Sequence, residues 1–330
     1  MALFRIMTTV GGNSLERCVS LLLALTSLLL VRAEPGWTQT YPVKPIRIVT
    51  TEVGSATEIV ARMIAQKLSP TLGQQLIIDN RGIIAGEIVS RAVPDGYTLL
   101  SYGSPLWLSP LMRDVPYDPV ADFAPITLTA AAPNILVVHP SLPARSVKEL
   151  IALAKARPGE LNYASSSTGG SPHLAGELFK SMAKVNIVRV PYKGAGPALI
   201  ALMGGELQLM FPAAGAVTPY VKAGKLRALA TTSLEPSPLA PGLPTMAAAG
   251  LPGYETASLL GVFAPARTPA AIVSKLHREI AQTLRSTEIR ERLFALGMEA
   301  VGNTPEQTAA TIKGEIAKWS RLIKEAGIRE

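Results

Sequence analysis

The sequence predicts an α/β protein of two lobes with mixed sheets, a hinged cleft between the lobes and a double crossover of the chain. Its 330 residues are enough for two domains. Apolar residues make up 48% and charged residues 17%, which excludes a disordered chain. Short strand patterns alternate with amphipathic helix patterns in two series, and the extended segments 126–138 and 254–264 connect them. Two independent α/β domains would produce a similar pattern and remain an alternative.

The first 33 residues are predicted to be a signal peptide rather than part of the fold. Arg5 and Arg17 precede the uncharged run Cys18–Val31. This run is too short to cross about 30 Å of hydrocarbon as a helix, but it suits the core of a signal peptide. Cleavage after Ala33 would leave a mature chain without cysteine, which excludes disulfides. A retained membrane anchor is the alternative.

The first series of elements begins after this segment. Residues 45–50 form a short apolar strand pattern, and from Glu58 apolar residues recur at helical spacing up to Leu68. Further strands are predicted at 76–79 and 98–102, and a short helix at 86–92.

The second series begins after the extended segment 126–138. Ser146 and Glu149 have the spacing of a capping box, which predicts a helix from there to Ala156. Ser171 is the expected N-cap of another helix, with Pro172 in its first turn. The remaining strands are predicted at 161–165, 187–191, 207–211 and 226–232, and the remaining helices at 197–203 and 217–223.

The last part of the chain is predicted to return to the first lobe. Residues 234–253 are rich in Pro and Gly, as in a linker, and an extended piece at 259–263 follows. Thr268 and Thr304 are the expected N-caps of two long helices, 269–284 and 305–325. This order assigns residues 34–130 and 257–330 to lobe 1, and residues 131–256 to lobe 2.

Two loops that each lead into a helix carry the polar chemistry. Small residues allow a ligand to approach backbone amides, and the amides of a first helical turn favour an anion. Ordinary capped turns are the alternative for each loop. The candidate ligand-binding residues are Gly54, Ser55, Ala56, Thr57 and Glu58 in the first loop, and Ser166, Ser167, Thr168 and Gly169 in the second. Tyr192 and Lys193 at one strand end, and Tyr102 and Ser104 at another, complete the set.

Other chemistries find little support. The three histidines, His139, His173 and His277, have no metal-ligand spacing, and no phosphate-binding or nucleotide motif is present. Ser171 lies near His173, which leaves a Ser/His hydrolase as a remote alternative that lacks a third group. The net charge of +8 is dispersed and aromatics are only 5%, so nucleic acid is not an expected partner. We therefore expect a binding protein, with no catalytic residue, metal or cofactor.

Eight motifs in order make the sequence similar to a known family. They are Tyr41–Arg47, Asp95–Leu100, Ser146–Lys155, Leu161–Ser166, His173–Lys180, Val190–Gly194, Gly224–Ala230 and Phe263–Pro269. Together they resemble the Bug-type solute-binding proteins, the extracytoplasmic receptors of tripartite tricarboxylate transporters. The resemblance covers about residues 40–328. It implies a type II periplasmic-binding-protein fold, a carboxylate ligand held by amides and hydroxyls of the two loops, and a periplasmic location.

Several departures from the family pattern lie on the loops. Ser55 stands where the family has a second glycine, Glu58 where it has aspartate, and Glu52 is an additional acid. Four residues are missing after Arg81, and Pro212 and Leu259 replace an aspartate and a tryptophan. An extra acid opposes a polyanion, so we expect a ligand that carries an amine or several hydroxyls.

The sequence therefore predicts a periplasmic receptor that captures a small organic acid or an amino-acid-like solute. The resemblance implies that it acts as a monomer and delivers the solute to membrane permease subunits. A periplasmic sensor that presents the liganded form to a sensor ectodomain is the second hypothesis.

Overall fold

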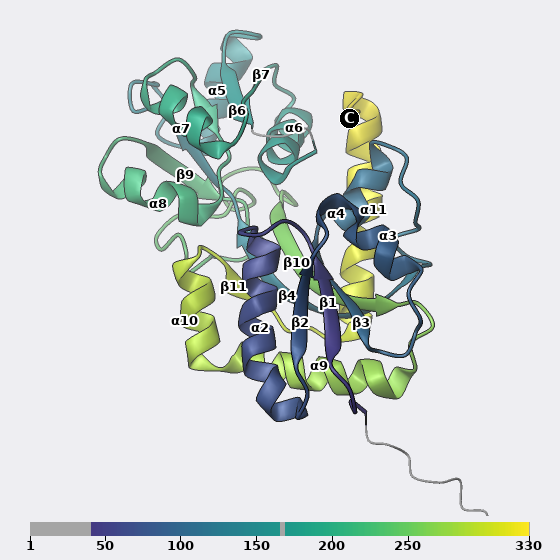
Figure 1. The fold of residues 1–330 in the computed structure, drawn as a ribbon. Helices are drawn as coiled ribbons and strands as arrows, with labels where there is room; N and C mark the ends of the chain where they lie inside the picture. The colour runs from purple at the N-terminus through teal and green to yellow at the C-terminus, as the bar shows by residue number, and fades with distance from the viewer. Residues whose placement is uncertain (1–40, 166–168, 330) are drawn as a thin grey trace, which may run out of the picture. The chain divides into compact units, whose positions relative to one another are not determined.

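The computed structural model describes residues 41–165 and 169–329, and Figure 1 shows their arrangement. The predicted signal peptide, residues 1–33, lies outside the described residues. Helices and strands alternate along the rest of the chain, as the sequence predicts for an α/β protein. The strands are β1 (Ile46–Thr50), β2 (Leu76–Asn80), β3 (Thr98–Gly103), β4 (Phe123–Pro133), β5 (Ile135–Val138), β6 (Asn162–Ser165), β7 (Val188–Pro191), β8 (Leu209–Met210), β9 (Arg227–Thr231), β10 (Ala257–Pro265) and β11 (Glu299–Ala300).

The strands form two mixed sheets that follow one plan. In the first sheet the order is β11-β4-β10-β3-β1-β2, with β1 parallel to β2 and β3, and β10 antiparallel to β3 and β4. In the second the order is β7-β6-β8-β5-β9, with β6 parallel to β7 and β8, and β5 antiparallel to β8 and β9. In each sheet, the strand that follows a crossover from the other sheet pairs antiparallel with an edge of the parallel strands. This strand is β10 in the first sheet and β5 in the second.

The chain passes twice between the sheets. Asn134 alone separates β4 from β5, so the first crossover is nearly continuous strand. The second runs from β9 through residues 232–256 into β10, where Ala257 pairs with Pro133 at the end of β4. The two crossovers thus lie side by side. The lobe boundaries at 130/131 and 256/257 remain a prediction, and β4 itself continues to Pro133.

Helices pack against both sheets. They are α2 (Ala56–Leu72), α3 (Ala85–Ser90), α4 (Pro105–Leu108), α5 (Val147–Ala156), α6 (Ser171–Ala183), α7 (Ala195–Met203), α8 (Ala214–Lys222), α9 (Ala270–Arg285), α10 (Thr287–Ala295) and α11 (Pro305–Ala326). On the first sheet, α2 contacts β2 and α9 contacts β4, whereas α3 and α4 contact β3. On the second, α6 and α7 contact β6. The C-terminal helix α11 contacts both α4 and α6.

Helix starts agree with the sequence in part. Ser146 and Thr304 are N-caps, and Thr304 forms a full capping box with Gln307. The expectation for Ser171 and Thr268 was wrong, because Gly170 and Pro269 are the caps: α6 begins one residue earlier than expected, and α9 one residue later. In α6 the cap has no side chain, so the Ser171 hydroxyl is free to bond elsewhere.

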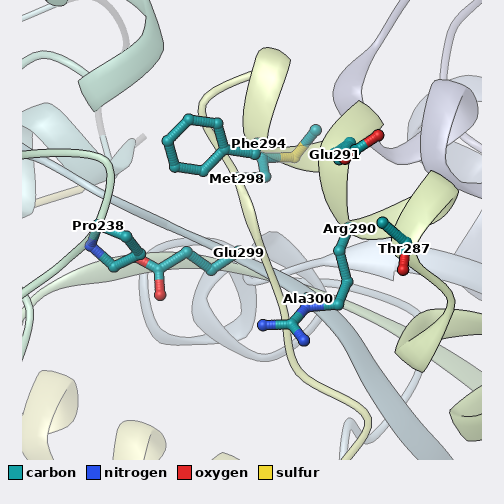
Figure 2. A pocket seen from close by; sticks show the side chains of 8 residues that line it. All are labelled: Pro238, Thr287, Arg290, Glu291, Phe294, Met298, Glu299 and Ala300. Atoms are coloured by element: carbon teal, nitrogen blue, oxygen red, sulfur yellow. The ribbon is translucent and has the colours of Figure 1, made fainter.

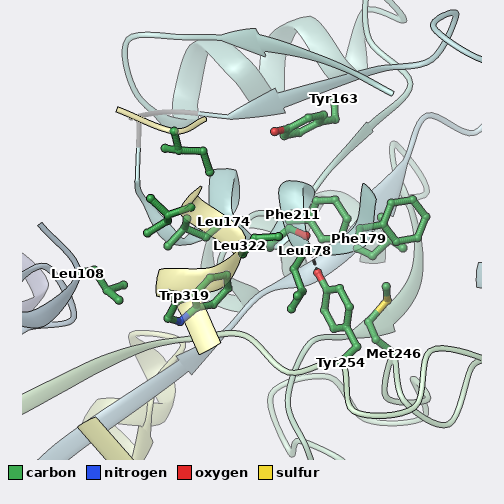
Figure 3. Close-up of a cluster of buried hydrophobic side chains, with 14 of the residues drawn as sticks. Leu108, Tyr163, Leu174, Leu178, Phe179, Phe211, Met246, Tyr254, Trp319 and Leu322 are labelled. Carbon is green, nitrogen blue, oxygen red and sulfur yellow. Dashed lines mark hydrogen bonds between the residues drawn. The ribbon is translucent and has the colours of Figure 1, made fainter. Parts of the chain in front are cut away.

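A continuous apolar cluster connects helices of both sheets (Figure 3). Leu108 of α4 and Trp319 of α11 belong to the same buried cluster as Leu174 and Leu178 of α6. Tyr254 of the second crossover donates a hydrogen bond from its hydroxyl to the carbonyl of Ala175, over 2.7 Å. Burial of these large side chains is the main stabilising force where α6 meets α11.

Gly176 allows the closest packing on α6, and this generates a prediction. A Cβ there would lie 2.3 Å from Cε2 of the fully buried Tyr163. We expect Gly176→Ala to lower the free energy of unfolding by about 2–3 kcal/mol, as overpacking does in cores. Gly314→Ala is the matched control, since nothing lies within 4 Å of its Cβ position in α11. It should stabilise by about 0.5–1 kcal/mol. Urea unfolding measures both, and equal effects would contradict the packing argument.

Candidate functional site

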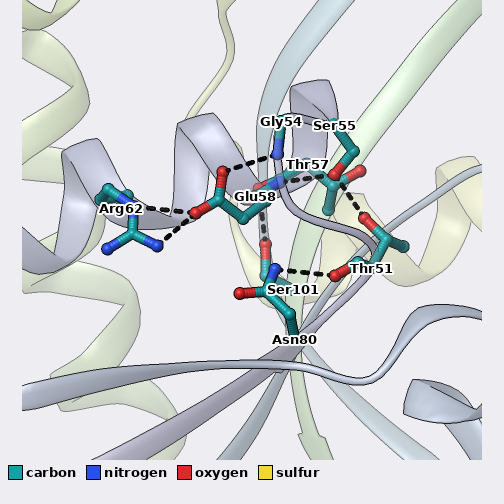
Figure 4. Close-up of polar contacts among 8 residues, drawn as sticks. All are labelled: Thr51, Gly54, Ser55, Thr57, Glu58, Arg62, Asn80 and Ser101. Atoms are coloured by element: carbon teal, nitrogen blue, oxygen red, sulfur yellow. Dashed lines mark hydrogen bonds and ion pairs between the residues drawn. The ribbon is translucent and has the colours of Figure 1, made fainter.

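The first predicted loop connects β1 to α2 and is held by its own side chains (Figure 4). Gly54 has a φ of +80°, which favours glycine. Ser55 is the N-cap of α2: its Oγ accepts the Glu58 amide at 3.2 Å and lies 2.6 Å from Thr51 Oγ1. The amides of Ala56 and Thr57 belong to the first helical turn, where the helix supplies no acceptor. These two amides are the donors that the loop can offer to a ligand.

Glu58 turns its carboxylate back onto this loop. Its Oε2 accepts the Gly54 amide at 3.3 Å, and its Oε1 accepts Nε of Arg62 at 2.8 Å. The Glu58 side chain is only 5% exposed, whereas that of Arg62 is 62% exposed. The charge of Glu58 is thus balanced from the solvent side by Arg62. The Glu58 carboxylate therefore packs against the loop backbone and is not exposed to solvent.

The added acid Glu52 lies at the outer edge of the same loop. A Cβ on Gly82 would be 3.0 Å from Glu52 Oε1, so the carboxylate lies against the glycine that follows β2. Burial and the charge of Glu52 raise the pKa of Tyr102, and Arg113 opposes this. The Tyr102 side chain in β3 is buried. Glu52 therefore places negative charge near Gly82, where the chain is shorter than in the family, and near Tyr102, a predicted ligand-binding residue.

Ser104 follows β3 and is tied to β10. Its Oγ accepts the Leu259 amide at 3.0 Å, and its own amide donates to the Leu259 carbonyl at 2.9 Å. Ser104 is 7% exposed. The residue therefore connects the end of β3 to the strand that enters from the second crossover.

The second predicted loop is described only in part. Ser166, Ser167 and Thr168 lie outside the described residues. Gly169 has a φ of +69°, and its amide donates to Nδ1 of His173 at 3.0 Å. The hydroxyl of Ser171 donates to Oδ1 of Asn134 at 2.5 Å. The start of α6 is thus fixed at two points, one on its own helix and one on the first crossover.

His173 is a buried, neutral acceptor. It is 3% exposed, and burial first, then the charges of Arg189 and Lys180, lower its pKa from 6.5 to about 4, against Glu177, which raises it. Because Nδ1 accepts the Gly169 amide, the proton of the neutral ring is on Nε2. Ser171 bonds to Asn134 and not to His173, so these residues do not form the Ser–His pair of the hydrolase hypothesis.

Tyr192 and Lys193 follow β7. The Tyr192 amide donates to the Ser165 carbonyl at 2.8 Å, and its half-buried ring packs against the apolar cluster of the second sheet. Lys193 is exposed. The structure gives neither side chain a place in the cavities described below.

A cavity of about 340 Å³ lies at the crossovers, and we call it the crossover cavity. Its lining includes Ser104, Asn134, Gly169, Ser171, Pro212 and Trp319. Two predicted residues, Ser104 and Gly169, therefore come together here. The first loop, Gly54–Glu58, and Tyr102, Tyr192 and Lys193 are not among the described lining residues.

The chemistry of the crossover cavity is mostly neutral. Among the described residues that line it, none is Lys or Arg, and the one carboxylate belongs to Glu315. That carboxylate is already paired with Lys318, and it accepts Nε1 of Trp319 at 2.7 Å. An anion in this cavity would meet hydroxyls, backbone amides and apolar walls. These are the contacts of a small-molecule pocket of ordinary size.

A larger cavity, of about 430 Å³, lies on α10 and β11 (Figure 2). Pro238, Arg290, Phe294 and Glu299 line it, and the Ser237 hydroxyl bonds to the Glu299 carboxylate. None of the predicted site residues that the structure describes lines this cavity. The crossover cavity is the better candidate because it joins segments of both sheets with residues chosen from the sequence.

Asn134 is the residue of this site that the sequence reasoning missed. It is 2% exposed, and its Nδ2 donates to the Phe211 carbonyl at 2.7 Å while Oδ1 accepts the Ser171 hydroxyl. A single amide side chain within the apolar stretch 126–138 was the available signal, since a buried amide needs specific partners.

Residues 41–165 and 169–329 contain no cluster of His, Cys, Asp and Glu that would hold a metal ion. Within the same ranges, no helix has both the length and the apolar character required to cross a bilayer.

Comparison with known proteins decides the family. The sequence matches the tripartite tricarboxylate transporter family receptor over residues 60–328. This chain belongs to that family. It is 36% identical to Protein BugT of Bordetella pertussis over 305 residues, which cover 90% of this chain and 94% of BugT. The resemblance found in the eight motifs is confirmed.

Solved structures show the same relationship. A Rhodopseudomonas palustris protein, Rpa4515 with adipate, is 39% identical with a TM-score of 0.71, over 88% of this chain and 99% of that one. MatC of the same organism, with bound malate, is 30% identical with a TM-score of 0.67, over 86% and 100%. The fold is thus of the periplasmic-binding-protein class, as expected. Other solved relatives are the periplasmic binding protein BugD and a TctC solute binding protein from Polaromonas, which confirms the expectation of a binding protein rather than an enzyme.

His173 generates a prediction about stability and pH. The unfolded chain takes up a proton near pH 6.5, whereas the folded chain keeps His173 neutral until about pH 4. The contribution of neutral His173 to the free energy of unfolding is therefore fully present well above pH 6.5 and is lost as the pH falls from 6.5 toward 4. The free energy of unfolding should decrease by about 2 kcal/mol between pH 7 and pH 5. His173→Asn, which keeps an acceptor near Nδ1 but does not titrate, should lose that part of the slope. Urea unfolding at pH 7 and pH 5 measures the loss of stability. An equal loss in the wild type and in His173→Asn would contradict the assignment of this pH dependence to His173.

Proposed function

We propose that this protein is a periplasmic receptor that captures a small carboxylate-containing solute for a tripartite tricarboxylate-type transporter. Membership of the receptor family carries the proposal. Relatives with adipate and with malate support a carboxylate as the solute. The signal-like sequence of residues 1–33 supports export to the periplasm. Membrane permease subunits are the proposed partners.

The proposed binding residues come from both loops. The amides of Ala56 and Thr57 and the Ser171 amide at the start of α6, next to Gly169 and Gly170, offer donors to an anion, with Ser104 at the crossover cavity. Ser166, Ser167 and Thr168 stay in the proposal as sequence-based candidates. Tyr192 and Lys193 are proposed only as residues near the second loop. The lobes would exchange between open and closed forms about the crossovers, and the ligand would stabilise the closed form.

The first test is binding of dicarboxylates to the purified protein. A ligand at 100 times its dissociation constant adds about 2.7 kcal/mol to stability, which a thermal shift detects. We expect adipate or malate to produce such a shift. Adipamide is the matched control, since it has the same carbon chain without the two charges. No shift with any member of a panel of dicarboxylates, hydroxy acids and amino acids would contradict the proposal.

The position of Glu52 leads to a prediction about ligand charge. Its carboxylate adds negative charge beside the first loop, and a like charge weakens binding of an anion. We expect Glu52→Gln to tighten binding of malate by about threefold and of citrate by more, as charge repulsion at the surface of a site predicts. Glu149→Gln is the control, because Glu149 is an acid in the first turn of another helix, α5, where it accepts the Arg145 amide and belongs to neither predicted loop. Calorimetric titration measures both, and equal affinities in the Glu52 variant and the wild type would contradict the role of Glu52.

A further inference from the structure

The first predicted loop and the described end of the second contain the same kind of hydrogen bond. In each loop a glycine of positive φ precedes the N-cap, and its amide donates to the side chain four residues later. In the first loop the pair is Gly54 and Glu58, over 3.3 Å. In the second it is Gly169 and His173, over 3.0 Å. Glu58 and His173 both occupy the third position of their helices, α2 and α6.

The acceptors differ in charge but not in burial. Glu58 is 4% exposed and His173 is 3% exposed. Glu58 is an anion whose charge is met by Arg62. His173 is a neutral ring that Arg189 of β7 and Glu177 and Lys180 of α6 surround. Each acceptor satisfies one glycine amide of its loop. The first-turn amides that have no helical acceptor are then those of Ala56 and Thr57 in α2 and that of Ser171 in α6, because Pro172 has no N–H and the His173 amide bonds to the Gly170 carbonyl.

We propose that His173 and Glu58 are positioning residues, and that each holds the glycine to which it bonds, Gly169 or Gly54, so that the start of its helix is placed to receive the solute. The inference rests on the proposed function, because it assumes that these loops bind the solute. Neither side chain touches the solute in this proposal. Each acts through the glycine amide that it accepts and thereby through the direction of the first helical turn.

The geometry at His173 carries the proposal furthest. Gly169, Gly170 and Ser171 line the crossover cavity, whereas His173 does not. The Gly169 amide donates to the ring, so this lining residue is held from outside the cavity by a side chain that does not line it. The Ser171 hydroxyl bonds to Asn134, and the Gly170 carbonyl accepts the amides of His173 and Leu174, so the ring is the side-chain acceptor for the Gly169 amide.

Ligand-free hydrogen exchange tests the positioning itself. His173→Ala removes the acceptor of the Gly169 amide, and we expect exchange at that amide to rise about three- to tenfold, as loss of one neutral hydrogen bond predicts. His173→Asn places Oδ1 near the position of Nδ1 and should restore slow exchange. Nitrogen chemical shifts of the His173 ring should show an unprotonated Nδ1 between pH 7 and pH 5.

Binding of adipate tests the consequence for the site. We expect affinity to fall about three- to tenfold in His173→Ala and in Glu58→Ala, and to recover in His173→Asn and Glu58→Gln, which keep an acceptor. Leu178→Ala is the packing control, because Leu178 is buried in α6 but lies away from the Gly169 amide. It should lower stability and leave affinity for adipate unchanged.

The outcomes separate this inference from the proposed function. Wild-type protein that binds neither adipate nor any other member of the panel would overturn the proposed function, and the inference with it. Wild-type binding that both alanine variants retain would overturn the inference alone. Unchanged exchange at Gly169 in His173→Ala, or an equal loss of affinity in Leu178→Ala, would do the same. Lost affinity that the Asn and Gln variants restore would support it.

Discussion

The hydrogen bonding of one buried amide, Asn134, is the constraint on which the arrangement of the site depends. Its backbone amide donates to Oγ1 of Thr232, and its carbonyl accepts the amide of Thr232. Its side chain bonds to Phe211 and Ser171. A buried amide with unmet partners costs about 1–3 kcal/mol for each, so these segments are held around a single residue.

This constraint links the crossovers to the loop that begins α6. Thr232 extends the network to the second crossover, because its Oγ1 also donates to the Thr256 carbonyl at 2.7 Å. Ser171 extends it to the wall of the crossover cavity. A change in the backbone at the crossovers therefore has a direct path to the described part of the second loop. The first loop is different, since its bonds run to α2, to Thr51 and through Asn80 to β2.

The scaffold was predictable because its signals are local. Residues 45–50 and 305–325 were predicted to within about one residue of β1 and α11, since apolar periodicity and an N-cap residue act over a few residues. The segment 126–138 was predicted only as extended, and it is in fact β4, Asn134 and β5. Helix α10 was missed, because its nine residues carry little apolar periodicity and its cap, Ser286, makes no side-chain hydrogen bond.

The site was less predictable because its contacts join distant parts of the chain. The sequence indicated both loops, but the bond from Ser171 to Asn134 spans 37 positions and has no local pattern. His173 was weighed as a catalytic base, whereas burial makes it a neutral acceptor. The spacing of four from Gly54 to Glu58 and from Gly169 to His173 is present in the sequence. Only the folded backbone shows that both pairs make the same bond.

The absence of Lys and Arg among the described lining residues of the crossover cavity explains why loop positioning matters. A lysine or arginine attracts a carboxylate over a distance and tolerates small shifts, whereas a backbone amide is effective only within about 3 Å and near alignment. Recognition by amides therefore depends on how precisely the loops are held. Glu52 adds a carboxylate beside the first loop, whereas Arg62 balances the charge of Glu58 and a neutral ring holds the described end of the second loop. In the proposed site, a carboxylate of the solute would therefore meet less opposing charge at the start of α6 than at the first loop.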